Sequence, residues 1–300
     1  MLDLHFQGAP HVIATAVLDT GAGLALVDPG PTSCLPALRA GLDALGARLP
    51  DVAAVLLTHI HLDHAGVTGH LARELPNLEV FVHERGAKHM IDPTRLLDSA
   101  KRLYGDQMDT LWGGFLPVPA GNVRALVGGE RISVGQRSLD VDYTPGHASH
   151  HVSYFEASGG LAFVGDTCGV RLGSSPFVMA PTPPPDIDLA AWDQSLRRIL
   201  AWSPQTLFLT HFGPAPTPPA EHVEALREAL DFSARTVRDA LAQHPDPADD
   251  GLAASVFAEA VRRRMRERLS AAEVRAYELG APLDHCYLGL ARFWRKVRGQ

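Results

Sequence analysis

The sequence predicts an α/β (α+β) protein in two parts, a domain of strands and helices over residues 1–213 and a helical subdomain over residues 214–300. Two observations predict this class. Short apolar runs, bounded by Gly, Pro and polar residues, alternate with amphipathic segments as far as about residue 210. Beyond the proline-rich "FGPAPTPP" (212–219), apolar residues keep helical spacing and no strand pattern recurs.

The first elements alternate between strands and helices. "HVIATAVLDT" (11–20) and "GLALVDPG" (23–30) predict a hairpin that ends in a Pro-Gly turn. "SCLPALRAGLDALG" (33–46) predicts a helix, because its apolar residues recur at helical spacing between a Ser and a Gly. "VAAVLLT" (52–58) is short and nearly all apolar, which is typical of a fully buried strand. A helix over 65–75 and a strand over 78–83 ("LEVFVH") are expected next.

A helical insert is expected over about residues 84–121, with a break at Pro93, because proline cannot continue a helix. The segment "PTPPPDID" (181–188) is too rich in proline for a helix or a central strand, so we expect a rigid loop. Further strands are expected near 123–127, 131–134, 138–144, 151–155, 161–165 and 205–210. Further helices are expected at 189–200, 219–244, 252–268, 270–279 and 283–298.

The stretch "LLTHIHLDHAG" (56–66) gathers His59, His61, Asp63 and His64 at the end of a predicted buried strand. Neutral imidazole and carboxylate are ligands that zinc, iron and manganese accept. A lone histidine is usually structural, but this spacing after a buried strand is typical of a metal site.

Three more ligand types follow predicted strands further along the chain. They are His147 in "VDYTPGHASHH", Asp166 in "LAFVGDTCG" and His211 in "TLFLTHFGP". Because strand ends of one sheet meet at one edge, this recurrence predicts that the three side chains converge there.

The ordered pattern of HxHxDH, His, Asp and His resembles that of the metallo-β-lactamase superfamily, over roughly residues 1–213. The insert, the "PPPDID" loop and a helical tail with "GLARFWRK" resemble a branch with a helical C-terminal extension. The resemblance implies an αββα sandwich with a dinuclear site between two sheets. It implies that His59, His61 and His147 hold one metal, that Asp63, His64 and His211 hold the other, and that Asp166 bridges them.

These residues imply a metal-dependent hydrolase. Two divalent ions about 3.5–4 Å apart can share a hydroxide that is ionised at neutral pH. The expected substrate is a small ester, thioester, lactone or phosphoester. Asp63 and Asp166 are expected to be catalytic, Asp63 as a proton acceptor or as a group that orients the nucleophile. Zinc is the expected metal, with iron and manganese as alternatives.

Other side chains have expected roles around this site. His151, four residues after His147, is expected to support a ligand rather than to be one. Candidate substrate contacts are His83, His89 and Arg171. His150 is expected to point outward, and Cys168 to be a small buried filler. The insert (Tyr104, Met108, Trp112, Phe115) and the loop 167–188 (Phe177, Met179) either overhang the metals or pack on the C-terminal helices.

Several superfamily activities fit the sequence less well. A bridging aspartate and the lack of an export signal disfavour antibiotic hydrolysis as the native role. Homoserine-lactone lactonases carry a tyrosine soon after that aspartate, whereas "DTCGVRL" has none. The residues with which glyoxalase II grips glutathione are not found at recognisable positions.

The charge, the hydropathy and the cysteine content of the chain indicate which classes of partner to expect. The net charge of −7 argues against nucleic acid, and no run of about eighteen apolar residues predicts a membrane span. The cysteines are widely spaced and no leader is evident, so we expect a reducing cytoplasm. The expected partner is a small-molecule substrate. The C-terminal helices either cover the monomer or form a homodimer face.

Two other classes remain open. A mononuclear iron oxygenase or redox protein would hold one metal and depend on oxygen or thiols. A scaffold on a hydrolase fold would use the basic residues 261–300, with ten Lys/Arg against four Asp/Glu, to hold a partner. A damaged ligand set would indicate the scaffold, and the set here is intact.

Overall fold

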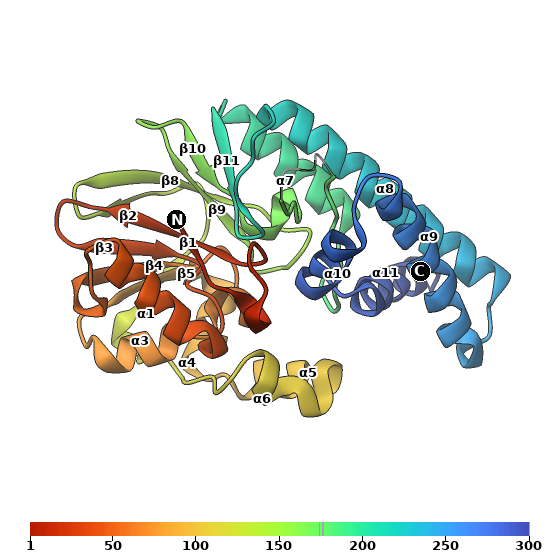
Figure 1. The fold of residues 1–300 in the computed structure, drawn as a ribbon, viewed down its shortest axis with the longest axis horizontal. Coiled ribbons are helices and arrows are strands. Elements are labelled where there is room, and N and C mark those ends of the chain that lie inside the picture. The colour runs from red at the N-terminus through yellow and green to blue at the C-terminus, as the bar shows by residue number, and fades with distance from the viewer. Residues whose placement is uncertain (174, 176, 300) are drawn as a thin grey trace.

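In the computed structural model, which describes residues 1–173, 175 and 177–299, two six-stranded sheets face each other and helices cover their outer faces (Figure 1). The first sheet has the order β1-β2-β3-β4-β5-β6, and the second has the order β12-β11-β10-β9-β8-β7. This is the αββα sandwich that the sequence resemblance implied. The chain completes the first sheet before it enters the second, so the two halves of the sandwich are consecutive in sequence.

The first sheet is built from a hairpin followed by parallel strands. β2 and β3 pair antiparallel, and β3, β4, β5 and β6 pair parallel. Parallel strands need crossover connections, which helices on the outer face supply. The strands are β1 (Leu2–Asp3), β2 (Ala14–Asp19), β3 (Leu24–Val27), β4 (Val52–Leu56), β5 (Glu79–His83) and β6 (Val123–Leu126). The helices before β6 are α1 (Leu35–Ala44), α2 (Leu62–Ala65), α3 (Thr68–Glu74), α4 (Glu84–Ile91), α5 (Thr94–Tyr104) and α6 (Met108–Leu111).

The second sheet is antiparallel except where β10 and β11 run parallel. That one parallel pair requires the crossover through α7 (Leu189–Ala201), which packs on the outer face. The strands are β7 (Arg131–Val134), β8 (Arg137–Tyr143), β9 (Val152–Glu156), β10 (Leu161–Phe163), β11 (Thr206–Leu209) and β12 (Gly213–Pro214). The remaining helices are α8 (Pro219–Gln243), α9 (Asp250–Arg266), α10 (Ala271–Gly280) and α11 (Leu283–Arg298).

Three apolar cores separate the four layers. Between the sheets, Ala16 and Leu18 of β2 meet Leu139 and Tyr154 of the second sheet, whereas Val17 packs on the helical side. This alternation follows from the two-residue period of a strand. Tyr154 also donates its hydroxyl to the Leu57 carbonyl at 2.8 Å, which ties the second sheet to the end of β4.

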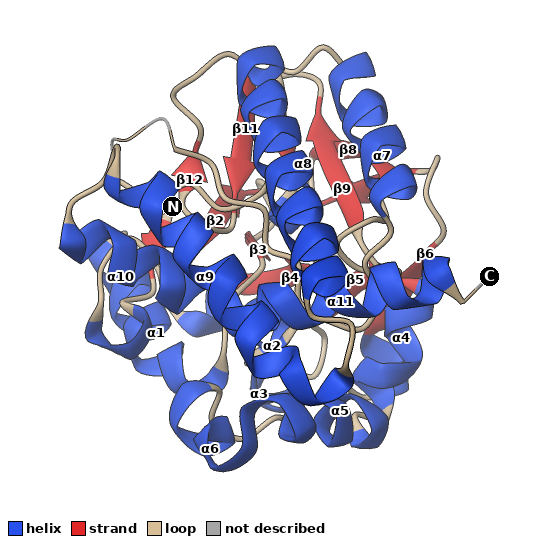
Figure 2. Cartoon of the chain, turned by 90° about the vertical axis from the view of Figure 1, so that its right-hand side faces the viewer, coloured by secondary structure: helices blue, strands red, loops and turns tan. Residues whose placement is uncertain are grey.

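The C-terminal helices continue the core on the outer face of the second sheet. Trp192 of α7, Leu226 of α8, Phe257 of α9, Tyr277 of α10 and Tyr287 of α11 belong to one buried cluster. Figure 2 looks onto these helices, with α7 and α8 lying over the strands of the second sheet. The domain boundary predicted between residues 213 and 214 stays a prediction. No helix among the described residues combines the length and apolar character that a membrane crossing requires.

Two expected elements differ from the observed ones. The helix expected over 65–75 is observed as α3, Thr68–Glu74, while α2 ends at Ala65, and the chain at Gly66, between the two helices, passes close to another segment. A side chain there would place its Cβ 2.9 Å from the Pro31 Cα. The strand expected over 161–165 ends at Phe163, and the next residues form a short 3-10 turn, Gly165–Cys168. Gly165 has φ +45°, which favours glycine, and the turn carries Asp166 away from the strand.

Candidate metal centre

The HxHxDH segment runs from the end of β4 into α2, which contains Asp63 and His64. His61 has an extended backbone conformation and precedes the first residue of α2. The turn is closed by a hydrogen bond from the His64 amide to the His61 carbonyl at 3.1 Å. The bend of the chain at this point therefore turns a linear motif into a cluster of side chains at the edge of the sandwich.

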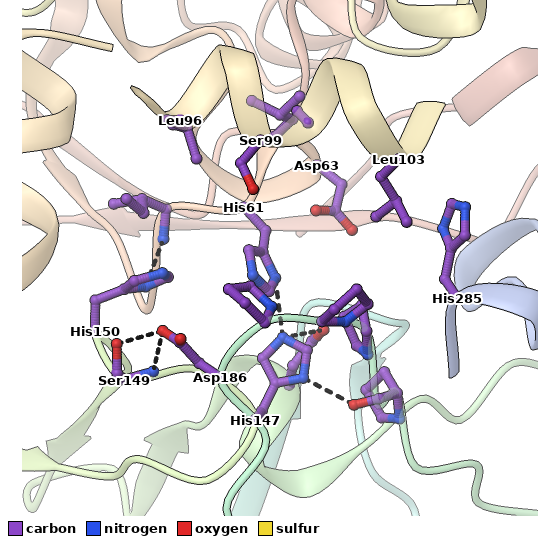
Figure 3. Close-up of a pocket in the computed structure, with 18 of the residues that line it drawn as sticks. His61, Asp63, Leu96, Ser99, Leu103, His147, Ser149, His150, Asp186 and His285 are labelled. Carbon is purple, nitrogen blue, oxygen red and sulfur yellow. Dashed lines mark hydrogen bonds and ion pairs between the residues drawn. The ribbon is translucent and has the colours of Figure 1, made fainter. Parts of the chain in front are cut away.

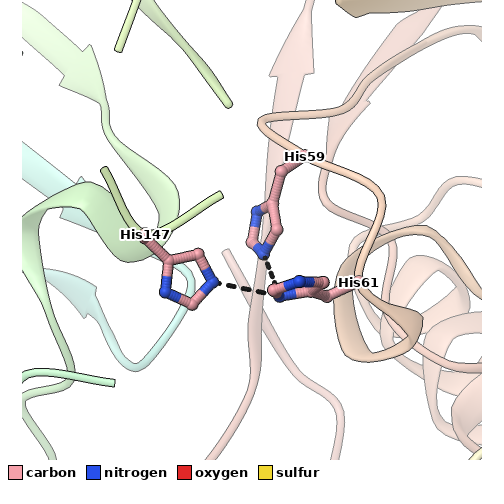
Figure 4. A group of neighbouring side chains, drawn as sticks. All are labelled: His59, His61 and His147. Carbon is pink, nitrogen blue, oxygen red and sulfur yellow. Dashed lines mark hydrogen bonds between the residues drawn. The ribbon is translucent and has the colours of Figure 1, made fainter. Parts of the chain in front are cut away.

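One group of three nitrogens joins the two sheets. Nε2 of His59 and Nε2 of His147 each lie 3.0 Å from Nδ1 of His61 (Figure 4). Two nitrogens that bind one zinc ion at 2.0–2.1 Å stand about 3.3 Å apart in tetrahedral geometry. The spacing of these atoms is therefore close to what a shared metal requires, and the three residues could hold one ion.

A second group lies beside the first. Nε2 of His211 is 3.4 Å from Oδ2 of Asp63, and Nε2 of His64 is 3.7 Å from the same oxygen. Asp166 stands between the two groups. Its Oδ2 is 3.4 Å from Nε2 of His147, and its Oδ1 is 3.4 Å from Nε2 of His64 and 3.6 Å from Nε2 of His211. One carboxylate thus presents one oxygen to each group.

Hydrogen bonds behind the rings fix which nitrogen faces the site. Nδ1 of His147 donates to the Pro181 carbonyl at 2.9 Å, and Nδ1 of His211 donates to the Val12 carbonyl at 2.8 Å. Nδ1 of His64 donates to the buried carboxylate of Asp28 at 2.8 Å. Each ring must then carry its lone pair on Nε2, which is the atom that points into the cluster.

The donor set also leaves buried atoms that a metal would satisfy. Among the residues that the structure describes, Nε2 of His64, Oδ1 of Asp166 and Nε2 of His211 are buried without a hydrogen-bond partner. Orphaned buried polar atoms are costly and rare. These three converge on one point, and they are imidazole nitrogens and a carboxylate oxygen, so the residues present fit a divalent metal.

The electrostatics of the two groups differ. Burial lowers the pKa of His59 and His147, and burial together with His147 lowers the pKa of His61 to about 4. In the second group, burial opposes charge, but Asp63 and Asp166 raise the pKa of His64 and of His211. Three neutral imidazoles therefore face one ion position, and the carboxylates concentrate negative charge at the other.

Asp28, at the end of β3, is a residue of this centre that the sequence analysis missed. Its carboxylate accepts hydrogen bonds from the Thr58 amide at 2.8 Å, and from the hydroxyls of Thr58 and Thr210 at 2.7 Å, besides the one from His64. The residue is fully buried and has φ +49°. The signal was present, because "LALVDPG" is another apolar strand followed by an aspartate.

His151 lies behind the first group. Its ring stacks on that of His59 with centroids 5.0 Å apart, and Nδ1 is within 3.1 Å of the hydroxyls of Thr144 and Thr167.

Cys168 is completely buried, which raises its thiol pKa far above the ordinary value. A thiol in that state is a poor nucleophile.

A cavity of about 550 Å³ opens onto the cluster, and His61, Asp63, His147 and Asp166 are among its lining residues. Figure 3 shows Leu96 and Ser99 of α5 above His61, and Leu103 of the same helix beside Asp63. The predicted contact His89 also lines the cavity. His83 and Arg171 are not among the described residues that line it.

His83 and Arg171 have other surroundings. His83 is buried, accepts a hydrogen bond from the Arg85 amide at 3.2 Å, and stacks on Tyr143 with centroids 4.4 Å apart. Arg171 is also buried, and its amide donates to the His211 carbonyl at 2.7 Å. The structure therefore gives no support to substrate contact by these two side chains.

His150 was expected to point outward, and this expectation was wrong. Its ring lines the cavity, with its centroid 5.6 Å from that of His61, and Nδ1 accepts from the Ile60 amide at 3.5 Å. His285 of α11 also lines the cavity, although its sequence context offered no signal. Of the aromatic residues in the insert, Tyr104 lines the cavity, whereas Trp112 stacks on Phe6 in the core.

Curated relatives match parts of this chain at modest identity. It is 29% identical over 162 residues to "Metallo-beta-lactamase fold-containing protein ST1585" of Sulfurisphaera tokodaii, covering 53% of this chain and 60% of that protein. It is 29% identical over 159 residues to a hydroxyacylglutathione hydrolase of Aeromonas hydrophila, covering 51% and 48%. It is 29% identical over 194 residues to the atrochrysone carboxyl ACP thioesterase of Aspergillus fumigatus, covering 62% and 46%. The chain thus spans about half of the length of the last two.

Solved structures share the fold. A metallo-beta-lactamase family protein of Thermus thermophilus, TTHA1429, superposes with a TM-score of 0.66 over 95% of this chain and 89% of its own, at 22% identity. Such coverage extends into the C-terminal helices. TTHA1623, solved in a di-iron-bound form, gives a TM-score of 0.52 over 71% of this chain and 92% of its own, at 28% identity. The family model described as the metallo-beta-lactamase superfamily matches residues 9–211. This match, with the sandwich and its cluster of histidines and aspartates, shows that the chain belongs to the metallo-β-lactamase superfamily.

Proposed function

We propose that the protein is a hydrolase that uses two divalent metal ions to cleave a small ester, thioester, lactone or phosphoester. The observation that carries the proposal is the position of Asp166, whose two carboxylate oxygens face two separate ligand groups. A carboxylate that served only one ion would not need a second set of buried ligands on its other oxygen. His59, His61 and His147 would hold one ion, and Asp63, His64 and His211 the other.

Divalent ions held there would lower the pKa of water into the neutral range and polarise the carbonyl or phosphoryl oxygen of the substrate. The residues of the chain prepare the site for this chemistry. Asp63 lines the cavity, and its Oδ2 faces His64 and His211, which lower the pKa of its carboxyl to about 2 although burial opposes the charge. The carboxylate therefore stays ionised and can orient the nucleophile by accepting a hydrogen bond. No cysteine or serine nucleophile is required.

The thioester is the member of the substrate group that the relatives support best. One relative is named a thioesterase, and others are named as hydrolases of an acylated glutathione. Zinc is the proposed metal because a set of three imidazoles, like that of His59, His61 and His147, is one that catalytic zinc sites use. Iron is the alternative, since a solved relative is described in a di-iron-bound form.

Metal content per chain tests the proposal. Protein purified without added metal is expected to contain two ions, and Asp166→Ala is expected to lose at least one of them together with the hydrolysis of acyl thioesters. Asp43→Ala, at an exposed position of α1, is the matched control and should retain both. A single iron that is unaffected by Asp166→Ala would overturn the dinuclear mechanism and indicate oxygen or sulfur chemistry instead.

A further inference from the structure

We propose that the cavity selects a substrate with an apolar acyl group and an anionic leaving group, held by opposite ends of the cavity. This inference rests on the proposed hydrolase function and names the substrate class of the same site. The anionic group would be a phosphate or a carboxylate bound by Arg85, Lys88 and Arg95, and the acyl group would lie against Leu103, Tyr104 and Pro282.

Three cations line the cavity on the side of Asp186. The charges of Lys88, Arg95 and Asp186 all reach His89, and those of Arg85 and Asp186 both reach Tyr143. Arg85 and Lys88 project from α4, and Arg95 projects from the first turn of α5. Within the part of the chain that the structure describes, no carboxylate lies within 4 Å of the charged groups of these residues. Asp92 is close to Arg95 in sequence, but its Oδ1 accepts from the amide and hydroxyl of Thr94 at 3.1 and 2.6 Å. These cations are therefore available to an anionic ligand, in a chain whose net charge is −7.

Apart from the candidate metal ligands, the cavity has a single acidic side chain, Asp186, among the described lining residues. It accepts hydrogen bonds from the hydroxyl and the amide of Ser149, the latter at 3.4 Å. Its charge is thus partly satisfied. The positive field of Lys88 and Arg95 also reaches His89, where burial and these two charges lower the pKa of the imidazole. Three cations against one bonded carboxylate give this end a net positive potential.

The other end of the cavity is apolar. Leu103 and Tyr104 come from the last turn of α5, and Ala281 and Pro282 come from the link between α10 and α11. The ring of His285 packs edge-on against Tyr104 at 4.9 Å, and burial lowers its pKa, so it is neutral at pH 7. This wall contributes no charge, which suits an alkyl or aryl chain.

The candidate metal ligands lie between the two ends. In Figure 3, Ser149, His150 and Asp186 are on one side of His61 and Asp63, and Leu103 and His285 are on the other. An acyl group placed at the apolar end would put its carbonyl over the ligand cluster and its leaving group toward the cations. A cavity of about 550 Å³ suits one small molecule of this kind.

Three hexanoyl thioesters with the same acyl group test the inference. S-hexanoyl-4′-phosphopantetheine carries a phosphate, S-hexanoylglutathione carries carboxylates, and S-hexanoyl-N-acetylcysteamine is neutral. We expect KM for one or both anionic thioesters to be about tenfold below that of the neutral one, the ratio that ~1.4 kcal/mol of binding energy produces. A lower KM for the phosphopantetheine thioester would identify the anion as a phosphate, and a lower KM for the glutathione thioester would identify it as a carboxylate.

Variants connect this preference to the cations. Lys88→Gln and Arg95→Gln are each expected to reduce the ratio of KM values between neutral and anionic thioesters at least threefold. Arg73→Gln, at an exposed arginine of α3 outside the cavity, is the matched control and should leave the ratio unchanged. Raised ionic strength should also reduce the ratio in the wild-type protein, since salt screens exposed charges.

Two failures can be told apart. Equal KM values for all three thioesters would overturn the anionic subsite while leaving hydrolysis intact. If a chain with two bound metals hydrolyses none of them, thioesters are excluded from the proposed function, and binding then tests the subsite alone. For that purpose S-hexylglutathione, a thioether that cannot be hydrolysed, would be titrated calorimetrically into wild-type, Arg95→Gln and Arg73→Gln protein. Titration of 4′-phosphopantetheine into the same three proteins tests the phosphate, and equal affinities in all three for both ligands would overturn the inference.

Discussion

Oδ2 of Asp28 accepts a hydrogen bond from Nδ1 of His64 at 2.8 Å, although the two residues come from different strand ends of the first sheet. The same carboxylate holds the amide and hydroxyl of Thr58, next to His59, and the hydroxyl of Thr210, next to His211. Asp28 therefore positions ligands from both sheets at once, without facing the ions itself.

Replacing Asp28 by Asn is expected to weaken metal binding at the group of Asp63, His64 and His211. The amide NH₂ of Asn would meet donors, and removal of the carboxylate would make His64 a weaker base. Loss of such an outer partner usually costs 10- to 100-fold in metal affinity. A competition titration with a chromogenic zinc chelator measures this, with Asp43→Asn, at an exposed site, as the control. Wild-type affinity in Asp28→Asn would contradict this role.

Metal removal is expected to lower the thermal stability of the protein. The ligand cluster is buried and contains two carboxylates, so bound cations stabilise only the folded chain. A free metal concentration of one hundred times Kd contributes about 2.7 kcal/mol for one site. Scanning calorimetry with and without EDTA, followed by addition of zinc, iron or manganese, measures the shift. Identical midpoints with and without chelator would show that no such linkage exists.

His222 of α8 is expected to make stability depend on pH. It is buried, and its Nε2 donates to the Cys168 carbonyl at 2.8 Å. Burial and the nearby Arg171 lower its pKa, and the Cys168 carbonyl opposes this shift only in part. Below about pH 6.5 the unfolded chain binds a proton here that the folded chain does not bind. The stability from this residue is therefore present above that pH and is lost as the pH falls toward the lowered pKa.

The variant His222→Gln retains an amide donor for Cys168 but cannot titrate. In metal-free protein, we expect wild type to lose stability relative to this variant as the pH is lowered from 7.5 to 5, by at most about 1.4 kcal/mol per pH unit. Urea unfolding of both proteins at each pH gives the difference between their free energies of unfolding. A difference that does not change between pH 7.5 and pH 5 would contradict the proposed titration of His222.

Gly289 of α11 is expected to be essential to the wall of the cavity. A Cβ at this position would lie 2.0 Å from the Thr182 carbonyl oxygen and 2.7 Å from the Pro183 carbonyl carbon. Gly289→Ala should therefore destabilise the fold by about 1–3 kcal/mol. The displaced loop contains Pro181, whose carbonyl orients His147, so metal affinity should also fall.

Gly251→Ala is the matched control for this effect. Gly251 lies in α9 with nothing within 4 Å of an added Cβ, so the substitution should stabilise the helix by about 0.5–1 kcal/mol through its propensity. Denaturant unfolding measures the free energy of unfolding of both variants, which should fall in Gly289→Ala and rise in Gly251→Ala relative to wild type. A Gly289→Ala protein as stable as wild type would show that the helix and the loop are not held in close contact.

The sandwich was predicted through the resemblance of the ordered ligand motif to one superfamily, and the metal-ligand candidates were predicted from local signals. His59, Asp166 and His211 each follow a short apolar run, and His147 follows a predicted strand after a Pro-Gly turn. His150 and His285 were not predicted to face the cavity, because their positions depend on contacts between segments far apart in the chain. His150 is placed by Ile60, and His285 by Tyr104. Arg85, Lys88 and Arg95 could not be assigned to the site from the sequence either, because only the folded chain brings α4 and α5 beside the metal-ligand candidates.

The residues of the cavity wall belong to neither sheet. Apart from the ligands and their direct neighbours, they come from α4 and α5, from residues 149–150 and 181–186, and from the start of α11 with its link to α10, whereas the metal-ligand candidates follow strands of the sandwich. Under the proposed function, most of the residues that would recognise a substrate are thus encoded apart from those that would cleave it. Substitutions in the wall are then expected to change which molecule is bound while leaving the metal-ligand candidates in place.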